Sequence, residues 1–237
     1  MSNLPTETPK TILIAGASRG LGQAMAAAFV SKGWHVIGTV RDGGRTDLHA
    51  LADAWPDQIT IAPLDITEPA QIGALRERLP SGALDILFVN AGTANRDAAA
   101  PAARVATEDF MQVMLTNALG VMRAVEGLED LVKADGLIGV MSSGQGSIAN
   151  NTSGGFEVYR ASKAALNQLM RSYAARQAGD PRAMVLMAPG WIRTGLGGPG
   201  APFSMEETIP TLVDTLIAQQ GRPGLRFIDR FGDTVPW

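Results

Sequence analysis

Residues 11–30 of the chain read TILIAGASRGLGQAMAAAFV, and this stretch decides the fold. Its first five residues are apolar or β-branched, which favours a buried strand. Three glycines follow within seven residues, at Gly16, Gly20 and Gly22, and an apolar run of helical type comes next. A glycine turn between a strand and a helix lets backbone N–H groups approach a pyrophosphate closely, although glycine also serves ordinary tight turns. The stretch therefore predicts a strand–turn–helix unit with a candidate nucleotide-binding turn.

The same alternation of short apolar runs and longer helical segments continues along the chain, which is typical of a parallel sheet covered on both faces. Strands are predicted at residues 11–15, 35–40, 59–62, 84–89, 137–141, 183–187 and 225–228. Helices are predicted at residues 21–32, 46–54, 69–78, 107–133, 157–178 and 205–220. No linker or internal repeat divides the pattern. We therefore expect one α/β domain at residues 11–237, a Rossmann-type doubly wound parallel sheet of about seven strands, after a flexible leader at residues 1–10.

The composition excludes several classes of function. The 237 residues carry a formal net charge of −3, so no basic field would attract nucleic acid or an anionic membrane surface. The chain contains no cysteine, which removes disulfide frameworks and thiolate metal sites, and we expect no metal centre. No run of 18 apolar residues occurs, and the first ten residues lack a signal-peptide pattern. We therefore expect a cytoplasmic protein that acts on a small molecule.

The spacing of the glycine turn indicates a particular family. The order Gly-x-x-x-Gly-x-Gly differs from the Gly-x-Gly-x-x-Gly of the general dinucleotide fingerprint. With this spacing in its first turn, the chain resembles the short-chain dehydrogenase/reductase family. The resemblance extends over nearly the whole chain, through six motifs in the right order. It implies that the following residues of the turn bind the cofactor: Gly16, Ser18, Arg19, Gly20, Leu21 and Gly22.

The end of the second predicted strand indicates which dinucleotide is bound. Proteins that select NAD usually hold the ribose hydroxyls with an acidic residue there, whereas a 2′-phosphate needs cations. Val40 occupies the acidic position, and Arg41 follows it. Arg41 and Arg19 match the basic positions of relatives that prefer NADP, unless both are simply exposed surface charges. We predict that the cofactor is NADP(H).

Three further segments resemble cofactor-binding segments of the family. Asp65-Ile66 follows the third strand and resembles the pair that contacts adenine. Asn90-Ala91-Gly92 follows the fourth strand and resembles the segment that steadies the sheet near the cofactor. Pro189-Gly190 follows the sixth strand, with Ile192 and Thr194 beyond it, and resembles the segment that meets the nicotinamide carboxamide.

Tyr159 and Lys163 are four residues apart in a predicted helix, so both project from the same face of it. A free tyrosine has a pKa near ~10, and a neighbouring cation lowers the pKa of the phenol. We therefore hypothesise that Tyr159 is the general acid of a carbonyl reduction. Lys163 would tune its pKa and hold the nicotinamide ribose. The alternative is an incidental Tyr–Lys pair on a helix surface, a spacing that arises often by chance.

A carbonyl that accepts hydride needs a hydrogen-bond donor aimed at its oxygen. Ser142 and Ser143 follow the fifth strand, where family members carry their catalytic serine, and Ser143 is our assignment, with Ser142 as the alternative. Asn117 matches the asparagine of the family's catalytic tetrad, and its expected role is to hold a water that relays protons to Lys163. Alternatively, Asn117 is a polar helix residue that faces solvent.

The substrate site is expected beside these residues, at Gln145, Phe156 and Trp191, with a substrate loop at about residues 189–220. These side chains favour an apolar carbonyl compound, unless Phe156 and Trp191 are ordinary packing residues. Ser143 and Tyr159 are sixteen positions apart, a few more than is common in the family. With the Pro-Trp ending, this interval resembles the branch that contains carbonyl reductases and C-factor-like proteins.

The sequence thus predicts an NADPH-dependent oxidoreductase that reduces an aldehyde, ketone or related carbonyl compound. Two alternatives remain: a non-enzymatic, C-factor-like signalling protein that retains the cofactor site, and an epimerase or dehydratase using NAD. Only about 40 residues follow Thr194, which leaves little room for a nucleotide-sugar domain. The resemblance further implies a homodimer or homotetramer that forms through the long helices on either side of the fifth strand.

Overall fold

Seven parallel strands form one sheet in the structure, a computed structural model that describes residues 9–41 and 43–237. Their order is β3-β2-β1-β4-β5-β6-β7. The strands are β1 (Thr11–Ala15), β2 (His35–Val40), β3 (Ile59–Pro63), β4 (Leu84–Val89), β5 (Val132–Met141), β6 (Ala183–Ala188) and β7 (Gly224–Asp229). The strand order reverses between β1 and β4, which is the switch point beside which open α/β sheets bind ligands. The predicted fold, a doubly wound parallel sheet of about seven strands, is confirmed.

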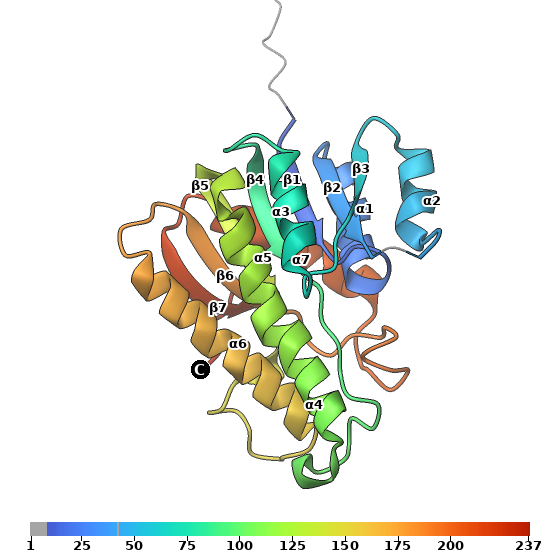
Figure 1. Ribbon diagram of the computed structural model, residues 1–237, viewed down its shortest axis with the longest axis vertical. Helices are drawn as coiled ribbons and strands as arrows, with labels where there is room; N and C mark the ends of the chain where they lie inside the picture. The colour runs from blue at the N-terminus through green and yellow to red at the C-terminus, as the bar shows by residue number, and fades with distance from the viewer. Residues whose placement is uncertain (1–8, 42) are drawn as a thin grey trace, which may run out of the picture.

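Helices cover both faces of this sheet and bury its apolar side chains in two separate clusters (Figure 1). One face carries α1 (Gly20–Ser31), α2 (Asp47–Ala54) and α7 (Met205–Gln219). The other carries α3 (Pro69–Glu77), α5 (Val121–Leu128) and α6 (Glu157–Arg176). Because both faces are covered, the central strands are buried along almost their whole length, which explains their nearly continuous apolar sequence.

The single helix predicted at residues 107–133 is wrong. α4 (Thr107–Met114) passes into a π-helical segment, Leu115–Gly120, before α5 continues to Leu128. Wider π-helical turns inside α-helices are frequent at functional sites. Helical periodicity in the sequence does not distinguish the two kinds of turn, because a π-helical segment of six residues interrupts the pattern only briefly.

The second error concerns β5, which begins at Val132, five residues before the predicted start. Val132 pairs with Leu84, and regular pairing resumes only where Leu137 meets Ile86. The intervening residues are stabilised by an ion pair of 2.8 Å between Lys133 Nζ and Asp85 Oδ1. The first five residues of β5, where the register is irregular, lack the continuous apolar run by which the rest of the strand is predicted.

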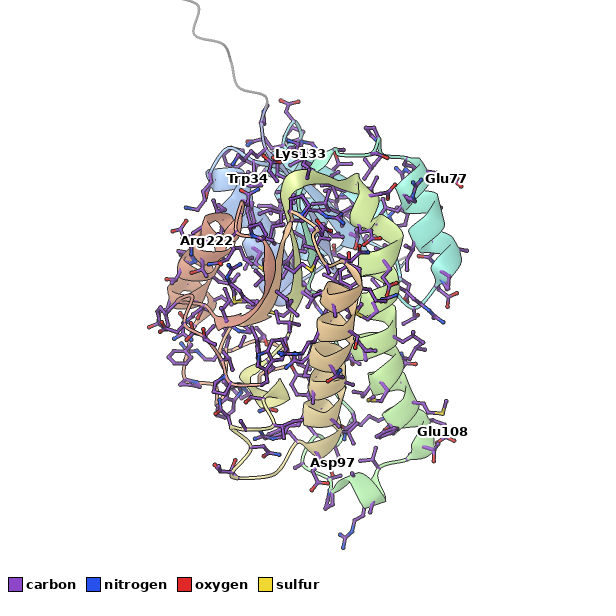
Figure 2. The ribbon with its side chains drawn as sticks, turned by 90° about the vertical axis from the view of Figure 1, so that its left-hand side faces the viewer. Trp34, Glu77, Asp97, Glu108, Lys133 and Arg222 are labelled. Carbon is purple, nitrogen blue, oxygen red and sulfur yellow. The ribbon has the colours of Figure 1, made fainter. Side chains whose placement is uncertain are left out.

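The carboxyl ends of the strands lie at one edge of the sheet, because all the strand pairs are parallel. Figure 2 shows Trp34 and Lys133 at the opposite edge, and Asp97 and Glu108 at the far end of the molecule, beyond the carboxyl edge. The long loops after β4, β5 and β6 emerge there. Most of the predicted leader at residues 1–10 lies outside the described residues. Within the described ranges, no helix is both long enough and apolar enough to cross a membrane.

Candidate active site

The glycine turn between β1 and α1 is fixed from both neighbouring strands. On the β2 side, the Gly16 N–H donates to Thr39 Oγ1 at 3.0 Å, and the Ala17 N–H donates to Thr39 O at 2.8 Å. On the β4 side, Asn90 Nδ2 donates to Gly16 O at 2.7 Å. A methyl group added at Gly22 would lie 2.1 Å from Gly16 O, so only glycine fits there. The turn is therefore a rigid backbone structure.

The N-terminus of α1 beyond this turn suits an anion. Arg19 is the N-cap residue, its side chain does not cap the helix, and the first turn carries no acidic residue. Its first N–H groups have no partner within the helix. Gly20 has a φ of +60°, and an added Cβ would meet nothing within 4 Å, so this position faces open space. Ser18 and Leu21 lie beside it, partly exposed. Uncapped N–H groups, the helix dipole and the arginine together match a phosphate.

The residues expected near the adenosine are arranged around the ends of β2 and β3. Arg19 and Arg41 are exposed, whereas Val40 is buried. Asp65 Oδ1 accepts bonds from the N–H and hydroxyl groups of Thr67, at 2.9 and 2.7 Å. Asp65 thereby shapes the chain before α3, in addition to any contact with adenine.

Asn117 is fully buried and is held by three hydrogen bonds. Its Oδ1 accepts from the Thr93 N–H at 2.8 Å, and its Nδ2 donates to Thr93 O at 2.8 Å and to Ser162 Oγ at 2.9 Å. The alternative that Asn117 faces solvent is therefore wrong. Asn117 ties the π-helical segment to the loop after β4 and to α6. Nearby, Ile66 packs against Gly120 of the same segment.

Lys163 is 2% exposed, which is unusual for a lysine. Its Nζ donates to Met141 O at 2.8 Å and lies 5.8 Å from the centroid of the Tyr159 ring. A Cβ built on Gly92 would lie 3.4 Å from both Lys163 Nζ and Asn117 Oδ1, so these two groups face the same small space. Burial disfavours the charged ammonium form and lowers the pKa of Lys163 to about 8.

Tyr159 has the opposite pKa shift from the one we predicted. Burial raises the pKa of the phenol to about 12, and hydrogen bonding with the Ser143 side chain opposes this shift only in part. The predicted lowering is wrong because desolvation dominates the pKa of the phenol and the Ser143 hydrogen bond offsets only part of it. Tyr159 is therefore protonated at neutral pH, and it can donate a proton.

The two serines after β5 have different surroundings. Ser142 is buried, and its hydroxyl donates to Asn167 Oδ1 at 2.6 Å. Ser143 is partly exposed, and its Oγ accepts from the Gln145 N–H at 3.1 Å. Accepting this bond uses a lone pair of Ser143 Oγ and leaves its hydroxyl proton available to Tyr159 or a ligand. The geometry thus favours Ser143 over Ser142 as the group that faces the site.

The residues expected to line the substrate site come from three loops at this edge. Gln145 is partly exposed, but its Oε1 is buried and has no hydrogen-bond partner among the described residues. Phe156 is exposed and left-handed, with a φ of 50°, and it directly precedes α6. A left-handed non-glycine residue stores strain. Trp191 is 54% exposed, so neither aromatic residue is a packing residue of the core.

The loop after β6, residues 189–203, is folded on itself. The Thr194 side chain accepts from the Gly197 N–H at 2.9 Å, and Trp191 Nε1 donates to Gly197 O at 2.7 Å. Ile192 is buried and bridges to Phe203. The Pro189 and Gly190 backbone lies beside the side chain of Arg230, which comes from the turn after β7.

Sequence reasoning missed several side chains that hold this site together. They are Thr39 at the glycine turn, Ser162 beside Asn117, Asn167 beside Ser142, and Arg230 beside Pro189. Ser162 and Asn167 lie on the helical face of Tyr159 and Lys163, three or four residues away, and this spacing is a usable signal. Thr39 and Arg230 carry no such local signal. Residues 9–41 and 43–237 contain no group of three or more His, Asp or Glu side chains suited to a metal ion.

Comparison with known proteins agrees with this geometry. The family model for short chain dehydrogenase matches residues 10–201. The C-signal protein of Myxococcus xanthus is 31% identical over 159 residues, which cover 66% of this chain and 95% of that protein.

Two solved structures are similar along nearly the whole chain. A Burkholderia multivorans structure, described as a short-chain dehydrogenase/reductase with bound NADP, is 60% identical and has a TM-score of 0.95, covering 97% of this chain and 100% of its own. A carbonyl reductase from Pseudomonas aeruginosa PAO1 in complex with NADP is 33% identical and has a TM-score of 0.89, with coverage of 97% and 100%. The predicted family and its carbonyl reductase and C-factor-like branch are confirmed: the chain belongs to the short-chain dehydrogenase family.

Proposed function

We propose that the protein is an NADPH-dependent oxidoreductase that reduces an aldehyde, ketone or related carbonyl compound to an alcohol. The convergence of Ser143, Tyr159 and Lys163 at the carboxyl edge of the sheet carries the proposal. Tyr159 interacts with Ser143, and the buried ammonium group lies 5.8 Å from the centroid of the phenol ring. An incidental pair on a helix surface would leave the lysine in water. Burial of a lysine beside a tyrosine costs stability, and such costs are typical of catalytic sites.

Different observations support binding of each part of the dinucleotide. For the phosphates, the support is the uncapped N-terminus of α1 with Arg19 and the open side of Gly20. For the 2′-phosphate, it is the exposed pair Arg19 and Arg41, together with the apolar Val40 at the position where NAD-selecting proteins carry an acid. The two similar structures that contain NADP add to this support. For the nicotinamide, the candidates are the Pro189 to Thr194 segment and Lys163.

The chemistry assigned to the chain follows from the positions of its protons. Bound NADPH supplies the hydride that adds to the carbonyl carbon. Ser143 donates its free proton as a hydrogen bond to the carbonyl oxygen and holds it near Tyr159. Tyr159, whose pKa is about 12, transfers its proton to the oxygen as negative charge develops there. Lys163 is mainly charged below its pKa of about 8 and stabilises the phenolate that remains.

A second candidate function is a signalling protein that retains the cofactor site without catalysis. The observation that favours it is the 31% identity to C-signal over most of that protein. A protein that only binds a dinucleotide has no need for Tyr159 as an acid beside Ser143, so we rank this function second.

The test uses the two tyrosines of the chain, Tyr159 and Tyr173, which both lie on α6. Tyr159→Phe should lower the rate of NADPH oxidation with aldehydes and ketones about 100- to 10,000-fold, because a general acid contributes that much. NADPH binding, followed by fluorescence, should remain within about threefold, because the phenyl ring is kept.

Tyr173→Phe is the matched control. Its hydroxyl donates to Glu129 away from the glycine turn, so this variant should lose stability and keep its turnover. Full activity of Tyr159→Phe would refute the assigned mechanism. Tight NADPH binding by a wild-type protein that turns over no carbonyl compound would favour the signalling function.

Three further predictions accompany this function. We propose that residues 11–237 act as one domain whose substrate loop spans about residues 189–220, with Gln145, Phe156 and Trp191 beside the substrate. The homodimer or homotetramer stays a prediction, to be measured by sedimentation. The cytoplasmic location also stays a prediction.

A further inference from the structure

A tight turn follows β7 at the carboxyl edge of the sheet, at residues 229–234. Asp229 Oδ1 accepts from the N–H groups of Phe231 and Asp233, at 2.9 and 3.0 Å. The Asp229 N–H donates to Asp233 O at 2.9 Å, and Ile228 bridges to Thr234. This turn is a small closed unit, and Arg230 lies at its start.

The backbone and side chain of Arg230 are both held. Thr215 Oγ1 of α7 donates to Arg230 O at 2.7 Å. The guanidinium carbon lies 4.1 Å from the centroid of the Phe203 ring and 4.4 Å from that of Phe231. Nη1 donates to Pro189 O at 3.2 Å. A planar guanidinium can stack on aromatic rings and donate a hydrogen bond at its edge at the same time.

Pro189 and Phe203 are the two ends of the loop after β6. Within the loop, the Arg193 N–H donates to Phe203 O at 2.9 Å and Ile192 bridges to Phe203, so the second end is joined to the middle. Arg230 contacts both ends at once, and its side chain connects this loop to the turn after β7.

Gly190 is adapted to the same arginine. Its φ of +98° is a conformation that side chains rarely adopt, and an added Cβ would lie 2.5 Å from Arg230 Nη1. The glycine therefore lets the guanidinium reach the backbone carbonyl of Pro189. Any side chain at position 190 would displace the guanidinium of Arg230, and the glycine there therefore supports a structural role for this arginine.

We propose that Arg230 is a positioning residue that fixes the loop at residues 189–203 and thereby sets the affinity for the nicotinamide half of NADPH. The inference rests on the proposed function, in which the Pro189 to Thr194 segment binds the nicotinamide. Arg230 acts through Pro189 and Phe203 and does not itself touch the reacting atoms.

The experiment separates the two halves of the cofactor with two ligands. NADPH occupies both halves, whereas 2′,5′-ADP has the adenosine and its 2′-phosphate and lacks the nicotinamide. Binding of each ligand is measured by calorimetry to wild type, Arg230→Ala, Arg230→Lys and the control Arg226→Ala. Arg226 lies on β7 near its amino end, where its side chain donates to the carbonyls of Arg222 and Pro223.

Arg230→Ala should weaken NADPH binding about tenfold, the value of one charge-assisted hydrogen bond, and change 2′,5′-ADP binding less than about twofold. Arg230→Lys should restore only part of the NADPH affinity, because an ammonium group keeps the charge and loses the planar stacking. The control should bind both ligands like wild type. In the reductase assay, the KM for NADPH should rise in Arg230→Ala by the same factor.

Unchanged NADPH binding in Arg230→Ala, or an equal loss for both ligands, would overturn the proposal. If Arg230→Ala does not fold, Phe203→Leu decides, because it removes the stacking surface and keeps the backbone bridge to Ile192. That variant should show the same selective loss of NADPH. A wild-type protein that binds neither ligand would instead refute the proposed function, and the two failures are therefore distinguishable.

Discussion

Different kinds of group fix the shapes of the two halves of the candidate site. The phosphate half consists of the glycine turn at residues 16–22 and its two supports, Thr39 and Asn90. Its shape comes from hydrogen bonds to the backbone of the turn and from glycines that leave no room for a side chain. The catalytic half consists of Asn117, Ser143, Tyr159 and Lys163, and its shape comes from polar side chains, of which Asn117 and Lys163 are almost fully buried. In the proposed function, the first half would bind a ligand that stays chemically unchanged at its phosphates, whereas the second would change its charge during the reaction.

This difference has an energetic consequence. Backbone N–H groups at a helix N-terminus attract an anion at little cost to the fold, because they are unpaired in any case. A buried ammonium group and a partly buried phenol lose solvation in their charged forms, and for this reason the pKa of Lys163 is lowered and that of Tyr159 is raised. The phosphate half should therefore tolerate loss of charge and resist added volume, whereas loss of the buried charge in the catalytic half should change both the stability of the fold and the activity.

After Tyr159→Phe, the largest effect should come from the two adjacent serines of the catalytic half. Ser143→Ala removes the donor to the carbonyl oxygen and should lower kcat about 100- to 1,000-fold. Ser142→Ala should leave kcat nearly unchanged but should lower the free energy of unfolding by about 1–3 kcal/mol, because buried Asn167 Oδ1 loses its donor. Steady-state kinetics and urea titrations on both variants check the contrast. The reverse pattern would make Ser142 the catalytic serine.

Added volume should have the next largest effect, in the phosphate half. The methyl group of Gly22→Ala would lie 2.1 Å from Gly16 O and 2.7 Å from Asn90 Nδ2. We expect a loss of up to about 3 kcal/mol in the free energy of unfolding, together with weaker NADPH binding. Gly73→Ala in α3 is the control, because its methyl group meets nothing within 4 Å. It should instead stabilise the protein by up to about 1 kcal/mol, through higher helix propensity. Similar thermal shifts in the two variants would contradict the rigid glycine turn.

Local spacing made much of both halves predictable from the sequence. The glycines at 16, 20 and 22 and the Tyr159–Lys163 pair are each read from fewer than eight consecutive residues. Burial is a property of the folded protein, and so the direction of the Tyr159 pKa shift was predicted wrongly. The choice between Ser142 and Ser143 depends on Asn167, 25 residues away, and the bond of Arg230 to Pro189 spans 41 residues. Contacts over such separations cannot be predicted from the periodic pattern of a single sequence.

The charge of Lys163 should cost stability in the catalytic half. Its pKa is about 8 in the folded protein and about 10.4 in an unfolded chain, so the unfolded chain binds more protons between these values. The free energy of unfolding should therefore rise with pH over that window. Below pH 8, the lowered pKa reduces the free energy of unfolding by about 3 kcal/mol. The hydrogen bond from Lys163 to Met141 stabilises the fold by about 1 kcal/mol, and a variant without the ammonium group would lose this contribution.

Lys163→Met should therefore be about 2 kcal/mol more stable than wild type at pH 7, and this gain should shrink toward pH 10. Urea titrations at both pH values measure it. Lys32→Met is the control, because Lys32 pairs with Asp214 at the surface and should change stability by less than about 1 kcal/mol. A less stable Lys163→Met protein at pH 7 would mean that the ammonium group supports the fold.

Removal of charge from the phosphate half should have the smallest effect and should leave the fold intact. Arg41→Ala should weaken NADPH binding about tenfold and leave NADH binding unchanged, because only NADPH carries the 2′-phosphate. Arg45→Ala is the control, since Arg45 is an exposed neighbour that pairs with Asp53. Fluorescence titrations at two salt concentrations sharpen the test: the wild-type preference for NADPH should fall as salt rises, because exposed charges are screened. An equal loss for both nucleotides would place the effect of Arg41 on the loop conformation and not on the phosphate. The expectation that the phosphate half tolerates loss of charge would then be wrong, because the Arg41 charge at the exposed end of β2 would be needed for the backbone conformation of that half.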